Sequence, residues 1–288
     1  MGGALAIALS KKGFEIENLM VRNFEKAGQV AELIAPEPNI LIFDKVSAVI
    51  ADIIFITTPD SEIENVAANL IAKINQKTDE KPFVFHTSGS RSSEILNNLK
   101  EIGCKTGSLH PLVSISDHVT GADSFRNVFF CVEGDADAVA MQKEIVEKLG
   151  GKSFSIETKY KTLYHAAAVT ACGHLVALID AALEMLEKCG LDESSGRQIL
   201  LPLIKSTIEN LEQQTTAAAL TGTFARADAE TLRRQIDALT ENVSPEALDI
   251  FLQLGRRSVH LAEMQGANRE KLEEVQKVIS LAKKNFRC

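Results

Sequence analysis

The segment IIFITTPD, residues 53–60, decides how this sequence folds. Its four consecutive apolar residues are typical of a strand that is buried on both faces, as in a parallel sheet. The polar residues and the proline that follow end the strand, and Asp60 or Ser61 can cap a helix predicted over residues 62–74. A strand, a short loop and a helix in this order form the repeating unit of an α/β fold.

The same alternation extends through the first half of the chain. Each predicted strand is followed by a helical stretch, and the last of these helices ends at Gly150 and Gly151. The predicted strands cover residues 19–21, 53–56, 83–85 and 127–132, and the predicted helices cover residues 24–34, 62–74, 92–101 and 135–149. The sequence therefore predicts a Rossmann-like parallel sheet in this half.

The second half changes to helices alone. A long stretch rich in Ala and Leu begins at Thr162 and ends near Gly190, and four more helical stretches follow. Pro202 is expected to bend or restart the second helix. The remaining helices are predicted over residues 193–214, 228–240, 245–265 and 268–285. We predict an α/β domain over residues 1–157 and an all-α domain over residues 158–288.

Composition excludes several classes of function. The chain of 288 residues has 31 Lys and Arg against 39 Asp and Glu, a net charge of −8, which argues against nucleic-acid binding. No uninterrupted apolar run reaches the ~18 residues that a membrane span needs, and the apolar start lacks the basic leader of a signal peptide. Five widely spaced cysteines without a C-x-x-C pair indicate buried, reduced thiols, so we expect a cytoplasmic protein.

The first residues resemble the end of a phosphate-binding loop. Gly2 and Gly3 open a helical stretch, as the glycines of a dinucleotide-binding loop do. About 20 residues later, Arg22 and Asn23 follow a predicted strand where a ribose-contacting residue is expected. An acidic residue there selects NAD, whereas Arg22 offers a cation to a 2′-phosphate, so NADP is the expected cofactor. The alternative is a flexible terminus before an ordinary helix.

A Rossmann sheet begins with a central strand before its glycine loop. No residues precede Met1 to form that strand, so we expect a missing stretch of about eight to ten residues, or a domain assembled in another way.

Further motifs resemble one family across nearly the whole chain. Beyond the glycine-rich start and Arg22, they are TPD at 58–60, HTSG at 86–89, LHPL at 109–112, KTLYHAAA at 161–168, LPL at 201–203 and LTGTFARAD at 220–228. The chain resembles two-domain Rossmann-like proteins that carry a helical C-terminal domain of unknown function. These are often described as deazaflavin-dependent NADP oxidoreductase-like, and they are related to pyrroline-5-carboxylate reductase and 6-phosphogluconate dehydrogenase.

This resemblance implies an oxidoreductase that transfers hydride between NADP and a small carbonyl or imine substrate, or the deazaflavin coenzyme F420. The chain departs from the family at Gly173, Thr223 and Ala227, where relatives tend to have Asn, Pro and Gly. Loss of an amide at Gly173 favours an alternative, in which a non-catalytic protein keeps the fold as a nucleotide sensor or interaction module. Titration with NADPH discriminates between the two.

Loops at the strand ends supply the candidate cofactor contacts, because such folds bind ligands at the carboxyl ends of their strands. His86 is either a contact in the cleft or an ordinary buried histidine, and the same two roles apply to His110, which is a candidate substrate contact. The candidate cofactor contacts in these loops are Thr57, Thr58, Pro59, His86, Ser88 and Gly89.

The candidate proton donors lie at the domain junction. Lys161, Tyr164 and His165 are offset by three and four residues, so they share one face of a helix. We predict that Lys161 or His165 acts as general acid and that Tyr164 orients the substrate. The position of Lys161 resembles that of the catalytic lysine of hydroxyacid dehydrogenase relatives. The alternative is that Tyr164 and His165 only pack between domains while Lys161 is solvated.

The remaining candidates lie in the helical half. Arg226 can bind a substrate carboxylate or phosphate, or pair with an acid across a dimer, and Asp228 is expected to cap a helix. A metal site is not expected, because His165 and His174 are nine residues apart and no carboxylate–histidine cluster accompanies them. We expect a homodimer formed through the helical domain, with the small-molecule substrate held between the domains.

Overall fold

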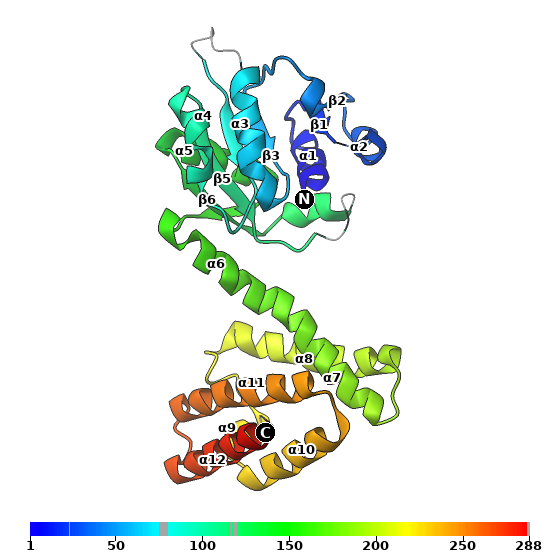
Figure 1. The fold of residues 1–288 in the computed structure, drawn as a ribbon, viewed down its shortest axis with the longest axis vertical. Coiled ribbons are helices and arrows are strands. Elements are labelled where there is room, and N and C mark those ends of the chain that lie inside the picture. Colours follow the sequence, from blue (N-terminus) through cyan, green and yellow to red (C-terminus); the bar gives the residue numbers. More distant parts are fainter. Residues whose placement is uncertain (23, 75–79, 116, 118–119, 287–288) are drawn as a thin grey trace. The chain divides into compact units, whose positions relative to one another are not determined.

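The computed structural model describes residues 1–22, 24–74, 80–115, 117 and 120–286. The chain forms two compact units, Met1–Thr170 and Ala171–Cys288. The first unit is a Rossmann-like α/β unit and the second is helical, which confirms the predicted fold class (Figure 1). The division at Thr170 falls inside the helical run that follows the predicted boundary at residue 157.

A five-stranded sheet forms the centre of the first unit. Its order is β3 (Ile53–Ile56), β4 (Phe83–His86), β5 (Lys105–Pro111), β6 (Phe129–Gly134) and β7 (Lys152–Phe154). Neighbouring strands are parallel except for β5 and β6, which are antiparallel. As a result, the start of β6 lies beside the carboxyl end of β5.

Two further strands form a sheet of their own. β1 (Asn18–Val21) pairs in parallel with β2 (Asn39–Ile42), and the helices α1 (Gly2–Ser10) and α2 (Phe24–Ala31) accompany them. Among the described residues, no strand pairs with β3 on the side away from β4. The expectation of a further stretch of chain before Met1 stays a prediction.

Alternating side chains of the strands build a core on each face of the large sheet. In β4, Phe85 joins a cluster with α1 and α5 (Ala136–Leu149), whereas its neighbour Val84 joins a cluster with α3 (Ile63–Lys73). Successive strand residues point to opposite faces, so an apolar run such as β4 is covered on both sides. Every residue of the predicted strand at 53–56 lies in β3.

The sequence prediction missed β2, β5 and β7, and it did not anticipate the antiparallel pairing. β5 has the sequence KTGSLHP, which lacks an apolar run, yet Thr106 and Ser108 in it are buried. The hydroxyl groups of both residues are satisfied, by the carboxylate of Asp135 and by the carbonyl oxygen of Ser88. A strand can therefore be central without the apolar pattern that identifies one in a sequence.

A nearly continuous helical run follows β7. It consists of α6 (Lys161–Ala168), a π-helical segment (Val169–Gly173) and α7 (His174–Lys188). The run Thr158–Lys188 is long and apolar enough to cross a membrane, with a mean hydropathy of 1.8 in its most apolar window. Only 6% of that window is buried. This segment contains no uninterrupted apolar run of ~18 residues, and the expectation that the protein does not span a membrane stays a prediction.

The second unit begins in this run and continues with α8 (Glu193–Gln213). The short α9 (Gly222–Ala225), which the sequence did not predict, packs against α11 (Pro245–Met264), while α12 (Arg269–Phe286) packs against both α11 and α10 (Ala229–Asn242). These last helices share an apolar core that includes Leu232, Leu252 and Val275. α8 continues through Pro202, so the helix does not restart there, and the alternative of a bend stays a prediction. Asp228 accepts a hydrogen bond from the Thr231 amide at 3.0 Å, as expected for a cap.

The cysteines differ in exposure. Cys104 and Cys131 are buried, but Cys172 and Cys189 are exposed on the helical run and at its end. The expectation of buried thiols is therefore wrong for the latter two. Cys288 lies outside the described residues.

Candidate active site

Candidate residues collect at one edge of the large sheet, in the first unit. The loops after β3 and β4 begin with Thr57 and Thr87, and His110 lies near the end of β5. These three strands are parallel, so their carboxyl ends meet at the same edge, where α/β sheets bind ligands. α6 adds Tyr164 and His165 to this edge.

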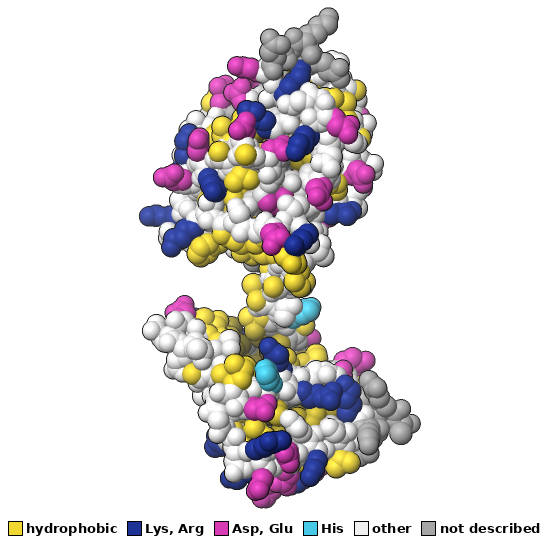
Figure 2. Space-filling model, turned by 90° about the vertical axis from the view of Figure 1, so that its left-hand side faces the viewer, with side chains coloured by type: hydrophobic (Ala, Val, Ile, Leu, Met, Phe, Trp, Pro, Cys, Tyr) yellow, Lys and Arg dark blue, Asp and Glu magenta, His cyan; other side chains and the backbone are white. Residues whose placement is uncertain are grey.

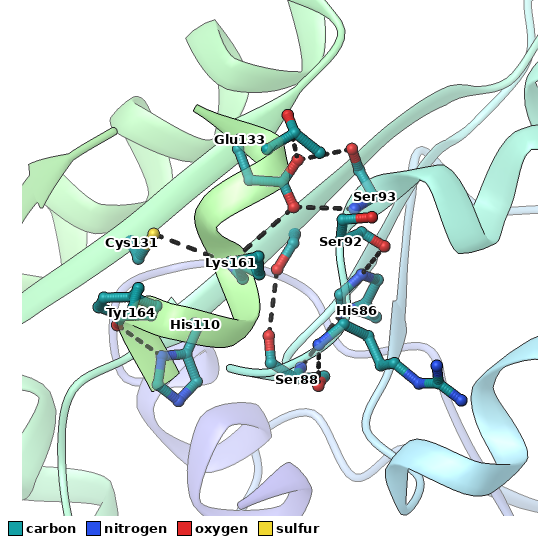
Figure 3. A network of polar contacts seen from close by, with 12 residues as sticks. His86, Ser88, Ser92, Ser93, His110, Cys131, Glu133, Lys161 and Tyr164 are labelled. Atoms are coloured by element: carbon teal, nitrogen blue, oxygen red, sulfur yellow. Dashed lines mark hydrogen bonds and ion pairs between the residues drawn. The ribbon is translucent and has the colours of Figure 1, made fainter. Parts of the chain in front are cut away.

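A buried network anchors the start of α6 to the sheet (Figure 3). Glu133 on β6 is 4% exposed and accepts hydrogen bonds from the amide and the hydroxyl of Ser93, at 2.8 and 2.7 Å. The hydroxyl of Thr158 donates to the same carboxylate at 3.4 Å, and Nζ of Lys161 lies 3.9 Å from it. The carboxylate therefore links β6, the 3-10 helix before α4 (Ser93–Leu96) and the start of α6 with the 3-10 helix that precedes it (Thr158–Tyr160).

Lys161 is the most deeply buried charged residue in this network. It is 1% exposed, with Nζ 3.7 Å from Cys131 Sγ and 5.7 Å from the centre of the Tyr164 ring. Burial lowers the pKa of Lys161, while Cys131 and Glu133 oppose that shift. The alternative of a solvated Lys161 is therefore wrong, and its assignment as general acid stays a prediction. Its position favours a role in holding α6 in place.

His110 and Tyr164 form a hydrogen-bonded pair at the sheet edge. Nδ1 of His110 lies 2.8 Å from the Tyr164 hydroxyl, and the His165 ring centre lies 5.8 Å from that of His110. Burial, followed by the charge of Lys161, lowers the pKa of His110 to about 4. Burial also raises the pKa of Tyr164. At neutral pH both groups are uncharged, and the phenol keeps its proton.

Gly89 is required where these rings meet. A Cβ built on Gly89 would overlap the His165 ring and would lie 2.6 Å from Nε2 of His110. Only glycine lets the loop after β4 approach both imidazoles so closely. The predicted loop residue Gly89 and the predicted substrate contacts His110 and Tyr164 thus lie together with His165.

His86 organises the loop that carries Gly89. The amide of Ser88 donates to Nδ1 of His86 at 3.2 Å, so Nε2 carries the hydrogen and donates to the Ser92 carbonyl oxygen at 3.1 Å. His86 is fully buried, and burial lowers its pKa to about 4. Both ring nitrogens are used within the loop. The geometry favours the structural alternative for His86, with Ser88 Oγ accepting from the amides of Ser90 and Arg91.

Asp60 supplies the negative charge beside this cluster. It accepts a hydrogen bond from the Ser90 hydroxyl at 2.5 Å. Although partial burial raises the pKa of Asp60, hydrogen bonds from Ser90 and Ser88 lower it, and the nearby ring of His165 lowers it further. The net shift is downward, so Asp60 is ionised at neutral pH. The sequence suggested only a capping role for this residue.

Some of the residues predicted to bind NADP lie where they could contact a phosphate or ribose group. Gly2 begins α1, whose first turn has neither an acidic residue nor a side-chain cap, and a Cβ on Gly2 would overlap the Thr57 hydroxyl. Within the described part of the chain, the buried hydroxyl of Thr58 has no hydrogen-bond partner. A helix N-terminus beside an unsatisfied hydroxyl suits a phosphate or ribose group. Gly3 follows Gly2 in α1, and Pro59 is exposed after Thr58.

Of the other predicted contacts, Arg22 lies near the segment that follows β3, whereas Arg226 lies in the second unit. Arg22 follows β1, is exposed, and has Nη1 4.0 Å from the Glu62 carboxylate. Asn23 lies outside the described residues. Arg226 is exposed in the second unit, where it contributes to lowering the pKa of Asp228.

Sequence reasoning missed Glu133, Ser93 and Cys131. The one available signal is Glu133 itself, an acidic residue at the end of the apolar strand FFCVEG, because a charge in such a strand requires a partner. Its partner Lys161 is 28 residues away, and no spacing rule connects the two.

Comparison with known proteins agrees with this architecture. Residues 1–111 match the model of a Rossmann-like domain, and residues 128–258 match the model of a domain of unknown function (DUF2520). None of the curated proteins is a match for this sequence.

Solved structures resemble most of the chain. Protein TM1727 from Thermotoga maritima is 25% identical, with a TM-score of 0.68 over 90% of this chain and 96% of that one. A candidate NADP oxidoreductase from Bacteroides fragilis, 21% identical, has a TM-score of 0.70 over 90% and 93%. An imine reductase from Myxococcus stipitatus in complex with NADP⁺, 13% identical, has a TM-score of 0.63 over 90% and 91%. The last two similarities establish the fold alone.

Proposed function

We propose that this protein is an NADP-dependent oxidoreductase that reduces a small imine in its protonated, iminium form. The observation that carries the proposal is the cluster of His110, Tyr164 and His165 around Gly89, with the ionised Asp60 beside it. This cluster lies at the strand ends, at the same edge as the orphaned Thr58 hydroxyl.

The choice of NADP as cofactor rests on residues at the start of α1 and in the loop after β3, and on structural neighbours. Gly2 at the start of α1, together with Thr57 and Thr58, would hold the phosphates, and Arg22 would contact the 2′-phosphate. The Myxococcus imine reductase has been solved with NADP⁺. A reductive aminase from Aspergillus terreus has been solved with NADPH, and it is 14% identical to this chain with a TM-score of 0.57. A bound NADPH supplies hydride.

The charges of the site favour a cationic substrate. The Lys161 charge is buried against Glu133, and the low pKa of His110 leaves that ring neutral. Asp60 is an acidic group whose negative charge acts on the His110 ring. A carboxylate substrate would be repelled there, whereas an iminium would be stabilised.

The protonation states of the site residues also favour an iminium substrate. Tyr164 has a raised pKa and His110 a lowered one, so neither is a strong acid at neutral pH. An iminium needs no acid in the hydride step: its carbon gains hydride, the C=N π electrons become the nitrogen lone pair, and a neutral amine forms. A ketone needs a proton on oxygen, and His165 or Tyr164 would have to supply it. In this proposal the His110–Tyr164 pair orients the substrate by hydrogen bonding.

Oxidation of NADPH, followed at 340 nm with 1-pyrroline, cyclohexanone and pyruvate, tests the proposal. We expect turnover with 1-pyrroline and little or none with pyruvate. Asp60→Asn should raise KM for the imine about 10-fold, the equivalent of one screened charge contact, and should leave any KM for cyclohexanone unchanged. Asp123→Asn is the matched control, because Asp123 is an exposed aspartate whose ion-pair partner is Lys11. Preference for pyruvate, or an unchanged imine KM in Asp60→Asn, refutes the substrate assignment.

A further inference from the structure

A cavity lies in the first unit at the C-terminal end of α1. Its volume of about 420 Å³ is within the range of small-molecule sites. Its walls come from that end of α1, from the 3-10 helix Thr120–Phe125 and from the last residue of α5. Gly2, at the opposite end of α1, is about 10 Å away along the helix axis. None of the residues that line the cavity belongs to the candidate active site.

The floor of the cavity is apolar. Ala8, Phe125 and Leu149 line it, and all three are buried members of the core cluster that joins α1 and α5. The Phe125 ring stacks on the Phe130 ring, with ring centres 6.0 Å apart. α1 and the 3-10 helix present Ala8 and Ala122 to the cavity, and these methyl groups leave the space between the helices open. The apolar part of a ligand would therefore lie on a packed floor.

The rim of the cavity is cationic. Lys11, Lys12 and Arg126 line it together with one acidic residue, Asp123, and all four side chains are exposed. Lys11 is already paired with Asp123, because its Nζ lies 2.9 Å from the carboxylate. Within the described part of the chain, neither Lys12 nor Arg126 forms an ion pair. Two such cations at the mouth of an apolar cavity favour an anionic ligand, even though the chain has a net charge of −8.

The end of α1 does not itself need these cations. Lys and Arg side chains near the last turn of a helix often compensate its free carbonyl groups. Here the backbone does so, because the amides of Lys12 and Phe14 donate to the Leu9 carbonyl oxygen at 2.9 and 3.2 Å. The amide of Gly13 donates to the Ser10 carbonyl oxygen at 3.0 Å. A role in capping the helix therefore does not explain the rim.

We propose that this cavity binds a small organic acid, namely a carboxylate with an apolar body, about ten heavy atoms in all. Lys12 and Arg126 hold the carboxylate, and the guanidinium of Arg126 offers it two parallel hydrogen bonds. The apolar body lies on Phe125 and Leu149. The site is independent of the proposed oxidoreductase activity.

Floor and rim together select this class of ligand. A sugar phosphate matches the rim, but its hydroxyl groups would lie on the apolar floor without hydrogen-bond partners. An aliphatic amine matches the floor, but the rim would repel its charge. An aliphatic or aromatic carboxylate matches both parts of the cavity.

Ligand-observed NMR titration of the full chain with sodium octanoate tests the proposal. We expect saturable binding with a Kd in the millimolar range or tighter, as suits a ligand of about ten heavy atoms. Sodium acetate has the carboxylate without the apolar body, and it should bind at least about tenfold more weakly. Lys12→Glu/Arg126→Glu should weaken octanoate binding at least about tenfold, because two attractive charges become repulsive.

The double variant has a matched control. Lys45→Glu/Lys143→Glu makes the same change of charge at two exposed positions that do not line the cavity, and it should leave the Kd for octanoate unchanged. All four substituted side chains are exposed, so circular dichroism should show the same helix content in both variants as in the wild type.

Three results would overturn the proposal. The first is octanoate binding that is no tighter than acetate binding, which would show that the apolar floor is not used. The second is a Lys12→Glu/Arg126→Glu variant that binds octanoate as tightly as the wild type, which would place the ligand on another apolar surface. The third is an equal loss of binding in the control variant, which would reduce the effect to net charge. These titrations contain no NADPH, so a failure of the proposed activity does not change their outcome.

Discussion

Removal of the Glu133 carboxylate should destabilise the first unit more than removal of its partner Lys161. In Glu133→Gln the buried ammonium loses its counter-charge and faces a neutral amide, the Cys131 thiol and the Tyr164 ring. In Lys161→Met the carboxylate still accepts hydrogen bonds from Ser93 and Thr158. Loss of one partner of a buried ion pair costs about 3–5 kcal/mol, and we expect Glu133→Gln at the upper end of that range.

Deprotonation of Lys161 limits that cost. A lysine with the ordinary pKa of 10.5 loses its proton at pH 7 for about 5 kcal/mol, at 1.36 kcal/mol per pKa unit. In Glu133→Gln the folded chain therefore holds a neutral amine while the unfolded chain stays protonated. Because the unfolded state binds more protons, the destabilisation should shrink by up to about 1.4 kcal/mol for each unit that pH rises from 7 towards 10.

Urea unfolding followed by tyrosine fluorescence measures this effect in the first unit alone, because both tyrosines, Tyr160 and Tyr164, lie there. Lys11→Met is the control: it removes an exposed ion pair with Asp123 and should cost less than about 1 kcal/mol. A loss below 1 kcal/mol in Glu133→Gln, or a loss that does not change between pH 7 and pH 9, would refute the idea that this pair is a buried anchor.

Three further predictions concern the site and its loops. Gly89→Ala should displace His110 and His165 and abolish turnover in the NADPH oxidation assay, and an active variant would show that this position tolerates a Cβ. Its control is Gly28→Ala, in the open interior of α2, which should stabilise the fold by about 0.5–1 kcal/mol in urea melts. His86 has a pKa of about 4 in the folded chain and 6.5 in the unfolded chain, so its contribution to the free energy of unfolding is complete above pH 6.5. Roughly 3 kcal/mol of that contribution is lost as pH falls to 4. Melts of His86→Asn should therefore show a flatter dependence of stability on pH than the wild type, and an equal slope would contradict this prediction. Thr58→Val should keep or raise the stability of the free protein and weaken NADPH binding several-fold, and calorimetry showing unchanged affinity would exclude this hydroxyl from the cofactor site.

Local patterns predicted much of the fold because they reflect local physics. The apolar run of β3, the capping by Asp228 and the left-handed Gly150 after α5 follow from burial, hydrogen bonding and backbone freedom within a few residues. β5 escaped prediction because its buried Thr106 and Ser108 are satisfied by groups that lie far away in the sequence.

In the candidate site, too, local patterns predicted some features, whereas features that depend on residues far apart in the sequence were missed. Helical spacing brought Tyr164 and His165 together, and the strand-end rule placed Gly89 and His110 near them. Spacing alone gave no indication that Lys161 is buried, because the carboxylate that compensates its charge comes from β6, an antiparallel strand that the sequence pattern did not pair. Long-range pairing of this kind depends on the assembled sheet.

Calorimetric titration of the full chain with NADPH and with NADH decides whether the first unit binds NADP. We expect saturable binding of NADPH in the micromolar range and binding of NADH that is at least about tenfold weaker, since only NADPH carries a 2′-phosphate for Arg22. Arg22→Ala should remove this difference, because Arg22 is exposed and its pairing with Glu62 is a surface contact. Absence of NADPH binding at 1 mM, or tighter binding of NADH, would show that this protein is not an NADP-dependent oxidoreductase.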